Sequence, residues 1–185
     1  MTTKEWWEFE EEEEKKGGFY KLKVGDNKLR ILTAFERVDQ LFEGMYPNGK
    51  YVRMVDENYV TKGEENVNTQ GWAWAIDRET GDMVILQVGR GVLKALATLR
   101  ADDEYAFDDF PMPYDVNIKN TGEGPARYSV VASRKNTPIT EEEMTELGAK
   151  TPISEILTKI KEKAGTVVEK TKIDYSEDAE GVIPF

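Results

Sequence analysis

Two strand-like segments combine basic side chains with aromatic rings. Residues 19–32, FYKLKVGDNKLRIL, carry four cations against one acid, and residues 119–135 carry four more against one acid. The eight cations are Lys21, Lys23, Lys28, Arg30, Lys119, Arg127, Arg134 and Lys135. Cations that hold phosphates beside rings that stack on bases are the chemistry of a site for single-stranded nucleic acid. A lysine stripe on a strand is also often plain solvated surface, and the composition leaves both interpretations open.

Histidine and cysteine are absent from all 185 residues. Their absence excludes disulfides, zinc sites built from these residues, thiol nucleophiles and histidine acid–base chemistry. Catalysis would need carboxylates with a metal, or lysine, serine or tyrosine, and no spacing singles such groups out. An acidic stretch with Asp102, Asp103, Asp108 and Asp109 could hold magnesium but is more typical of a solvated loop. We therefore expect a protein that is not an enzyme and needs no cofactor.

The net charge of −11 is concentrated at the two ends of the chain. Residues 1–16 hold three lysines and seven glutamates, and residues 140–185 hold six lysines and eleven acids. Residues 17–139 contain sixteen basic and eighteen acidic side chains, so they carry only −2. Since phosphate binding depends on nearby lysines and arginines, the overall acidity does not exclude a nucleic acid partner for this central part.

The residues of the centre, 71–99, predict a hairpin followed by a helix. Trp72, Trp74 and Ile76 alternate with alanines, residues 78–82 supply turn chemistry, and residues 83–88 form an apolar, β-branched run. Apolar residues at helical spacing follow two glycines. Alternation places Trp72 and Trp74 on one face, which is either core or the floor of a binding groove.

Further turn signals around residues 24–27, 47–49 and 120–125 predict three more hairpins. Short strands with one helix in the middle favour a small barrel over a repeated βαβ fold, which needs several crossover helices. We therefore expect a mainly β protein with appended helices, built on a five-stranded OB-type barrel with one helix between strands.

The predicted organisation has four parts. Residues 1–17 form an acidic N-terminal arm, 18–136 the barrel, 137–168 a helical appendage and 169–185 an acidic C-terminal tail. Aromatic residues at positions 6, 7 and 9 accompany the acids of the arm; we favour an anchor that docks the arm on the domain over subunit contacts or a cover for the groove. Thr140 with Glu143 predicts a helix start, and isoleucines and leucines at helical spacing follow from residue 153.

The last twelve residues, DYSEDAEGVIPF, run from acids into an apolar tip. Such a tip can place its side chains in a partner's pocket while a basic side chain of the partner binds the terminal carboxylate. The residues that we expect to bind a partner are Glu177, Asp178, Glu180, Ile183, Pro184 and Phe185. The alternative is a tail that happens to end in apolar residues.

Residues 183–185, Ile-Pro-Phe after an acidic run, resemble the C-terminal tip of bacterial single-stranded DNA-binding proteins, which recruits replication and repair enzymes. Separately, the segments DNKLRIL, WAWAIDRETGDMVIL and YDVNIKNTGEGPARYSVV resemble the OB-fold single-stranded DNA-binding proteins of tailed bacteriophages. The chain lacks the Cys/His zinc site of the T4-like members, and its tip has fewer acids than the bacterial pattern.

The resemblance implies a non-enzymatic protein that binds single-stranded DNA without sequence preference, in the cytoplasm of a bacterial host. It would protect strands during phage DNA replication, recombination and repair, recruit proteins through its tip, and allow a homo-oligomer. No apolar run approaches the roughly 20 residues that span a bilayer, so we expect no membrane partner. Two other classes stay open: an acidic adaptor or DNA mimic that binds a DNA-processing enzyme, and a magnesium-dependent nuclease.

The residues that we expect to contact DNA are the basic and aromatic side chains of the predicted strands. They are Lys21, Lys23, Lys28, Arg30, Tyr46, Tyr51, Arg53, Trp72, Trp74, Lys119, Arg127, Tyr128, Arg134 and Lys135.

Removal of residues 174–185 tests whether the acidic tail competes with DNA phosphates for the cationic groove. We expect the truncated chain to bind a fluorescent oligonucleotide more tightly than the full chain at low salt, with the difference shrinking as salt screens the tail. Equal affinities at low salt would reject the competition.

Overall fold

A computed structural model describes residues 18–44, 50–56, 58–63, 65–124, 126–133 and 135–163, except for the side chains of residues 50 and 51. Eight strands form one sheet: β1 (Phe19–Tyr20), β2 (Gly25–Ile31), β3 (Glu36–Glu43), β4 (Lys50–Val55), β5 (Asn66–Asp77), β6 (Met83–Gly89), β7 (Val116–Asn120) and β8 (Tyr128–Ala132). The helices are α2 (Arg90–Ala101), α3 (Glu141–Ala149) and residues 153–163. In this part of the chain, no helix is long and apolar enough to cross a membrane.

The sheet is open, so the prediction of a closed barrel is wrong. Its order is β1-β6-β5-β2-β7-β8, with β3 pairing β5 and β4. At one end β1 occupies the edge of β6 through a short parallel ladder, and at the other end β8 forms its ladder with β7 and contacts α2. The terminal strands β1 and β8 therefore do not pair with each other, and the described strands do not close into a barrel.

The predicted hairpin and helix of the centre are confirmed. β5 and β6 pair antiparallel from Gln70 opposite Gly89 to Ile76 opposite Met83, and α2 begins directly after β6. The hairpins β3–β4 and β7–β8 also form, but residues 19–31 do not make a hairpin. Instead β2 pairs with β5 on one edge and with β7 on the other, so neither edge is open to β1. β1 pairs with β6.

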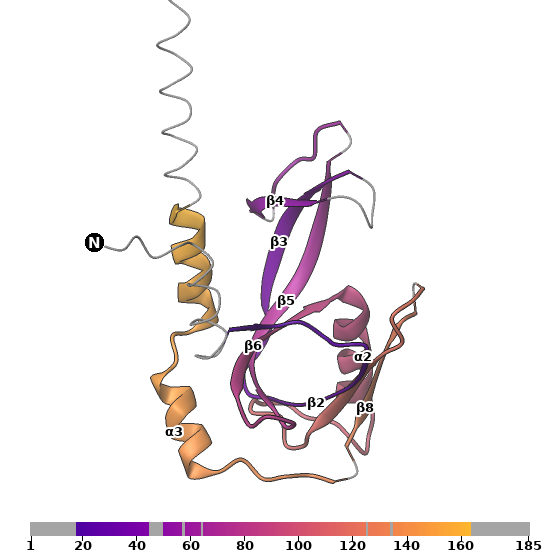
Figure 1. Cartoon of the computed structure of the whole chain (residues 1–185), viewed down its shortest axis with the longest axis vertical. Helices are drawn as coiled ribbons and strands as arrows, with labels where there is room; N and C mark the ends of the chain where they lie inside the picture. Colours follow the sequence, from indigo (N-terminus) through magenta and orange to yellow (C-terminus); the bar gives the residue numbers. More distant parts are fainter. Residues whose placement is uncertain are drawn as a thin grey trace, which may run out of the picture.

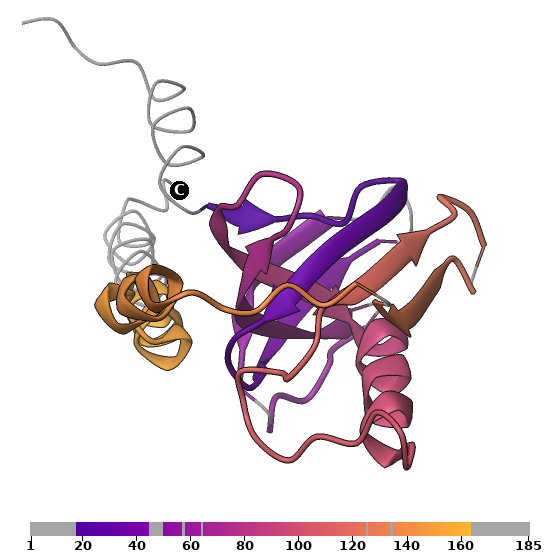
Figure 2. The same cartoon turned by 90° about the horizontal axis from the view of Figure 1, so that it is seen from below.

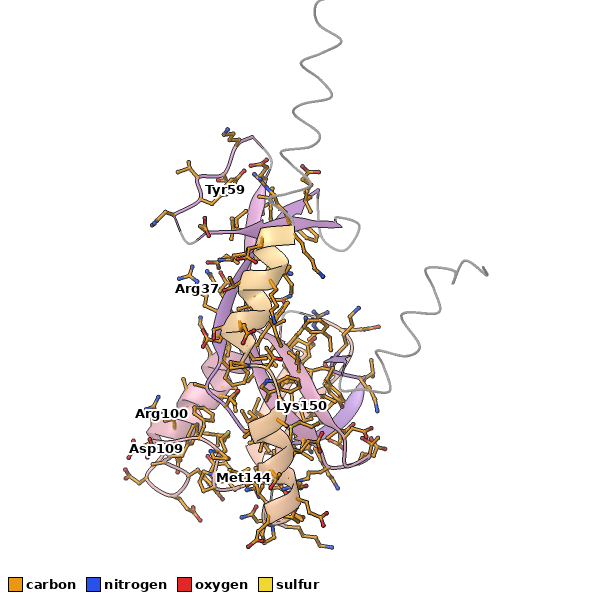
Figure 3. The ribbon with its side chains drawn as sticks, turned by 90° about the vertical axis from the view of Figure 1, so that its left-hand side faces the viewer. Arg37, Tyr59, Arg100, Asp109, Met144 and Lys150 are labelled. Carbon is orange, nitrogen blue, oxygen red and sulfur yellow. The ribbon has the colours of Figure 1, made fainter. Side chains whose placement is uncertain are left out.

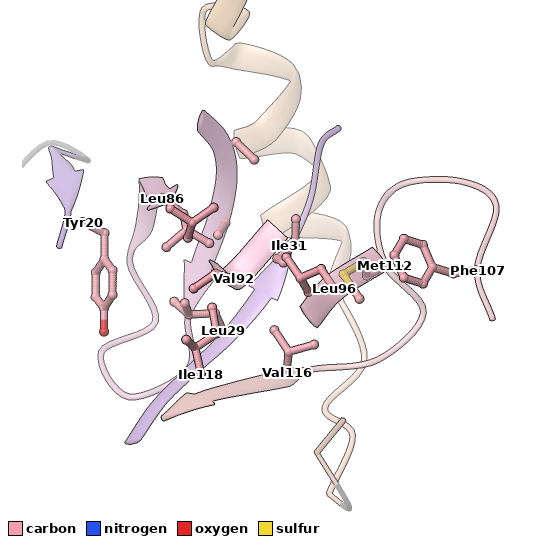
Figure 4. Close-up of a cluster of buried hydrophobic side chains, with 13 residues drawn as sticks. Tyr20, Leu29, Ile31, Leu86, Val92, Leu96, Phe107, Met112, Val116 and Ile118 are labelled. Carbon is pink, nitrogen blue, oxygen red and sulfur yellow. The ribbon is translucent and has the colours of Figure 1, made fainter. Parts of the chain in front are cut away.

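Alternation along β5 and β6 separates two apolar cores. Ala73 and Ala75 face one cluster with Leu86 and the α2 residues Val92 and Leu96, which Figure 4 shows packed among side chains of β2 and β7. Gly71 permits this arrangement, because a Cβ there would lie 2.9 Å from the Leu93 Cδ2 atom of α2. The helix therefore lies close against β5.

The opposite face of the sheet carries the second core. Trp72 and Trp74 are 2% and 5% exposed, and they pack with Ile153 and Leu157 of the helix formed by residues 153–163. Figure 2 shows the helical segment in orange and yellow on one side of the strands and α2 in pink on the other. The question left by the sequence is thereby answered: the tryptophan face is core, covered by the appended helices.

The strands β3 and β4, with the first half of β5, extend away from the rest of the sheet (Figure 1), while Val38 of β3 and Met54 of β4 still contribute to the second core. Glu36 through Phe42 pair continuously with Trp72 through Asn66, so the projection is a regular extension of the sheet. We call it the β3–β5 projection. It carries the start of β5 away from the tryptophans to a surface position.

One buried carboxylate joins the sheet to the segment before α3. The Oδ1 atom of Asp115 accepts hydrogen bonds from Arg30 Nε at 2.5 Å and from Arg78 Nε at 3.1 Å, and its Oδ2 atom accepts from the Thr137 backbone N–H at 3.1 Å. Arg78 also contacts Glu143 of α3 at 2.9 Å. Since Arg30 and Asp115 are each 3% exposed, this network is part of the interior.

Replacing Asp115 by Asn tests the importance of this carboxylate. Asp115→Asn leaves the buried Arg30 guanidinium without its counter-ion, so we expect a loss of about 3–5 kcal/mol in the free energy of unfolding. Urea unfolding measures it. The matched control, Glu155→Gln, removes an exposed pair with Lys159 on one helix, which contributes about 0.5 kcal/mol or less. Similar small losses in both variants would contradict the assigned role.

Candidate functional site

A groove of about 670 Å³ lies where the β3–β5 projection meets the rest of the sheet. Its wall includes the residues after β1, the end of β3, the first half of β5, the end of β6 and the start of β8. The lining residues are Lys21, Leu22, Phe42, Gly44, Asn66, Val67, Asn68, Gln70, Gln87, Gly89, Arg127 and Tyr128. We call it the main groove.

The lining of the main groove combines three kinds of side chain. Lys21 and Arg127 are cations, Phe42 and Tyr128 provide aromatic rings, and four side chains are amides. None of the described residues that line it is acidic. The groove is therefore suited to an anion that also carries flat rings and hydrogen-bonding edges.

The amides come from neighbouring strands. Asn66, Asn68 and Gln70 alternate along β5 and therefore share one face of the strand. Gln87 stands on β6 opposite Trp72, two residues further along β5. The Trp72 indole N–H donates to the Gln70 Oε1 atom at 3.3 Å, which links the amide row to the buried tryptophan face.

Lys21 is positioned by a buried asparagine. Asn27 is 1% exposed, and its Oδ1 atom accepts from the Tyr20 hydroxyl at 2.8 Å and from the Lys23 backbone N–H at 2.9 Å. Its Nδ2 atom donates to the carbonyl oxygens of Lys23 and Ile118 at 2.9 and 3.0 Å. These bonds hold residues 20–23 against β2 and β7, with Lys21 at the groove.

Tyr20 keeps its proton well into the alkaline range. Burial raises the pKa of its hydroxyl to about 12, and the carboxylates of Asp77 and Glu79 add to the shift. The hydroxyl therefore remains a donor to Asn27 throughout the physiological range.

The β7–β8 hairpin brings Arg127 and Tyr128 to the groove beside Lys21. The Arg127 guanidinium carbon lies 4.9 Å from the centre of the Tyr128 ring, within cation–π distance. The Thr121 backbone N–H donates to the Arg127 carbonyl at 2.8 Å, which closes the hairpin just before β8. Arg127 and Tyr128 therefore contact each other and both line the groove.

Of the residues predicted to contact DNA, Lys21, Arg127 and Tyr128 line the main groove. Five exposed cations stand on the surface outside its lining: Lys23, Lys28, Arg53, Lys119 and Lys135. Arg30, Trp72 and Trp74 are buried, so their side chains are engaged in the cores and the Asp115 network. Tyr46, Arg134, the Tyr51 side chain and the six tip residues 177, 178, 180 and 183–185 lie outside the described part of the chain.

Sequence reasoning missed Phe42 and the four amides. Residues 66–70, NVNTQ, alternate amides with Val and Thr. That period of two is the strand signal that could have identified Asn66, Asn68 and Gln70; no comparable signal singles out Gln87 or Phe42.

The acidic stretch proposed for magnesium is an exposed connector between α2 and β7. Asp102, Asp103, Asp108 and Asp109 are all exposed, and Figure 3 places Asp109 on the outside of the molecule. Within the described ranges, no three acidic side chains gather closely enough to hold a metal ion.

Replacing Tyr20 by Phe tests its raised pKa. A tyrosine that ionises near pH 10 when unfolded and about pH 12 when folded stabilises the fold fully below pH 10 and loses this contribution as the pH rises to 12. We expect Tyr20→Phe to make the alkaline fall in unfolding free energy shallower. The control Val131→Ala, at an exposed side chain that does not titrate, should retain the wild-type slope; an unchanged slope in Tyr20→Phe would contradict the shift.

No family model, curated protein or solved structure matches the chain. The side chains of the main groove and the sequence patterns are accordingly the observations that bear on function.

Proposed function

We propose that this chain is a non-enzymatic protein that binds single-stranded DNA in the main groove without sequence preference. The observation that carries the proposal is the gathering of two cations, two rings and four amides in one groove without a described acidic lining residue, on a chain of net charge −11. In so acidic a protein, a groove whose described lining holds two cations and no acid favours an anionic ligand.

Each kind of side chain has a distinct task in this proposal. Lys21 and Arg127 bind phosphates, while Phe42 and Tyr128 stack on bases. The amides bond to exposed base edges, which a single strand leaves unpaired. Because every base has a π face and amides can both donate and accept, the groove tolerates any sequence.

The position of the groove supports a comparison of the open sheet with the strand order of an OB fold. We infer that β2 with β3 corresponds to the bent first strand, β5 and β6 to the second and third, and β7 and β8 to the last two, with α2 between β6 and β7. OB folds bind oligonucleotides on the second and third strands and on the loops beside them. The main groove has the corresponding lining, from β5, β6, the end of β3 and the β7–β8 hairpin.

The proposed cellular role is protection of single strands during phage DNA replication, recombination and repair. The acidic tip would recruit replication or repair proteins, and the protein would act in the cytoplasm of the bacterial host. These parts of the proposal depend on the sequence resemblance, because the tip lies outside the described residues.

Salt-dependent binding of a fluorescent oligothymidylate tests the cations. We expect Lys21→Ala and Arg127→Ala each to weaken binding and to reduce the slope of log affinity against log salt by about 0.7, the value for one phosphate contact on a single strand. The control Lys94→Ala removes an exposed lysine on α2 outside the groove and should change neither. Absence of salt-dependent binding by the full chain favours the adaptor class, and cleavage with magnesium but not EDTA favours a nuclease.

Leucine substitutions test the rings while retaining apolar packing. We expect Phe42→Leu and Tyr128→Leu to weaken binding by up to about 1–3 kcal/mol for each base that loses its stacking partner, with the salt slope unchanged. Tyr105→Leu, at an exposed ring outside the groove, is the matched control. Equal affinities for all three variants would remove stacking from the proposal.

A further inference from the structure

A second pocket, of about 520 Å³, lies between the tryptophan face of the sheet and the appended helices. Its apolar wall includes Trp74, Ile85, Ile156 and Ile160. The Trp74 indole N–H already donates to the Thr151 carbonyl at 3.0 Å, so the polar edge of this ring is satisfied. The floor of the pocket therefore calls for an apolar ligand group.

Three lysines surround this floor: Lys150, Lys159 and Lys163. Lys150 stands at the junction after α3 (Figure 3), with its Nζ atom 5.6 Å from the centre of the Trp74 ring. Lys150 and Lys159 pair with Glu146 and Glu155 of their own helices, whose side chains are about half exposed. Such pairs contribute little free energy, so an incoming carboxylate that contacts these lysines has little to displace. No acid is among the described residues that line the pocket.

An apolar floor with a lysine rim fits a peptide that carries large rings and many carboxylates. Residues 6–14 of this chain, WWEFEEEEE, have this composition, with three aromatic rings and six glutamates. Gly18 and Phe19 line the pocket, so the segment is covalently joined to its wall. Position 9 is nine residues before Gly18, a span of at most about 32 Å.

We propose that the lysine-rimmed pocket is the intramolecular docking site for residues 6–14. The rings of Trp6, Trp7 and Phe9 cover the apolar floor, and the glutamates face the lysines. The acidic tip of the chain also follows a pocket residue, Lys163, but its twelve residues 174–185 hold two aromatic rings and four acidic side chains, against three rings and six acids in the nine residues 6–14. The N-terminal segment matches both properties of the pocket more fully. The proposal is independent of DNA binding.

Disulfide trapping in the full chain tests the proposal, because the natural sequence contains no cysteine. Phe9→Cys is combined with Ile160→Cys on the pocket wall or with Thr158→Cys, an exposed position on the same helix outside the pocket. The two helix positions differ by two residues in chain length but face different directions. We expect mild oxidation to link positions 9 and 160 at least about tenfold faster than positions 9 and 158, since docking raises the local concentration of the thiol.

Charge reversal supplies a second measurement. Lys159→Glu with Lys163→Glu should slow the trapping at position 160 by roughly tenfold through like-charge repulsion, while circular dichroism checks that the helices remain. Equal rates at positions 160 and 158, or no effect of charge reversal, would overturn the proposal. Disulfide-linked dimers at low protein concentration would assign the occupant to a second copy, and faster trapping from Phe185→Cys would assign it to the C-terminal tip; either result also rejects the intramolecular arm.

Discussion

The strict alternation of side chains along β5 is the constraint on which the rest of the structure depends. In its second half both faces are buried: alanines face α2 and tryptophans face the appended helices. In its first half the strand continues beyond both cores, and the amides of Asn66, Asn68 and Gln70 reach the main groove. One twelve-residue strand thus joins the two cores to the candidate binding surface, and a shift of register by one residue would exchange its faces.

Local patterns predicted the β5–β6 hairpin and α2 because the information lies within neighbouring residues. The openness of the sheet was not predictable in this way, since it depends on β1 joining β6 and on β8 lying beside α2. Arg30 illustrates the same difficulty for the site. In the sequence, Arg30 and Lys28 are both cations in the same strand-like pattern, and nothing distinguishes them. Arg30 is buried because it bonds to Asp115, which is 85 residues away. The basic and aromatic pattern selected Lys21, Arg127 and Tyr128, which line the main groove, and equally Lys28 and Lys119, which do not, because a local pattern cannot show which side chains converge. The amides were missed because amides are common in loops.

The main groove and the lysine-rimmed pocket resemble each other in charge but differ in the other side chains that line them. The main groove and the lysine-rimmed pocket are both free of acidic side chains among their described lining residues. They differ in what accompanies the cations: amides and accessible rings in the first, an aliphatic and indole floor in the second. Phe19, which is 46% exposed and contacts the edge of Trp72 at a centroid distance of 4.8 Å, stands on the short strand β1 between Lys21 of one site and Gly18 of the other. The two-residue strand β1 therefore connects both surfaces.

The position of β2 has a consequence for how the chain folds. β2 pairs with β5 on one side and with β7 on the other, and Leu29 meets Val116 only after 86 intervening residues have been ordered. Because closing such long loops costs chain entropy before any contact is gained, β-rich topologies of this kind fold in milliseconds to seconds rather than microseconds. During synthesis, β2 is complete at Ile31, but its second neighbour β7 is complete only at Asn120. Until β7 is made, one edge of β2 has no partner strand, and the lysines and arginine within residues 21–30 are charges of the kind that disfavour edge-to-edge association.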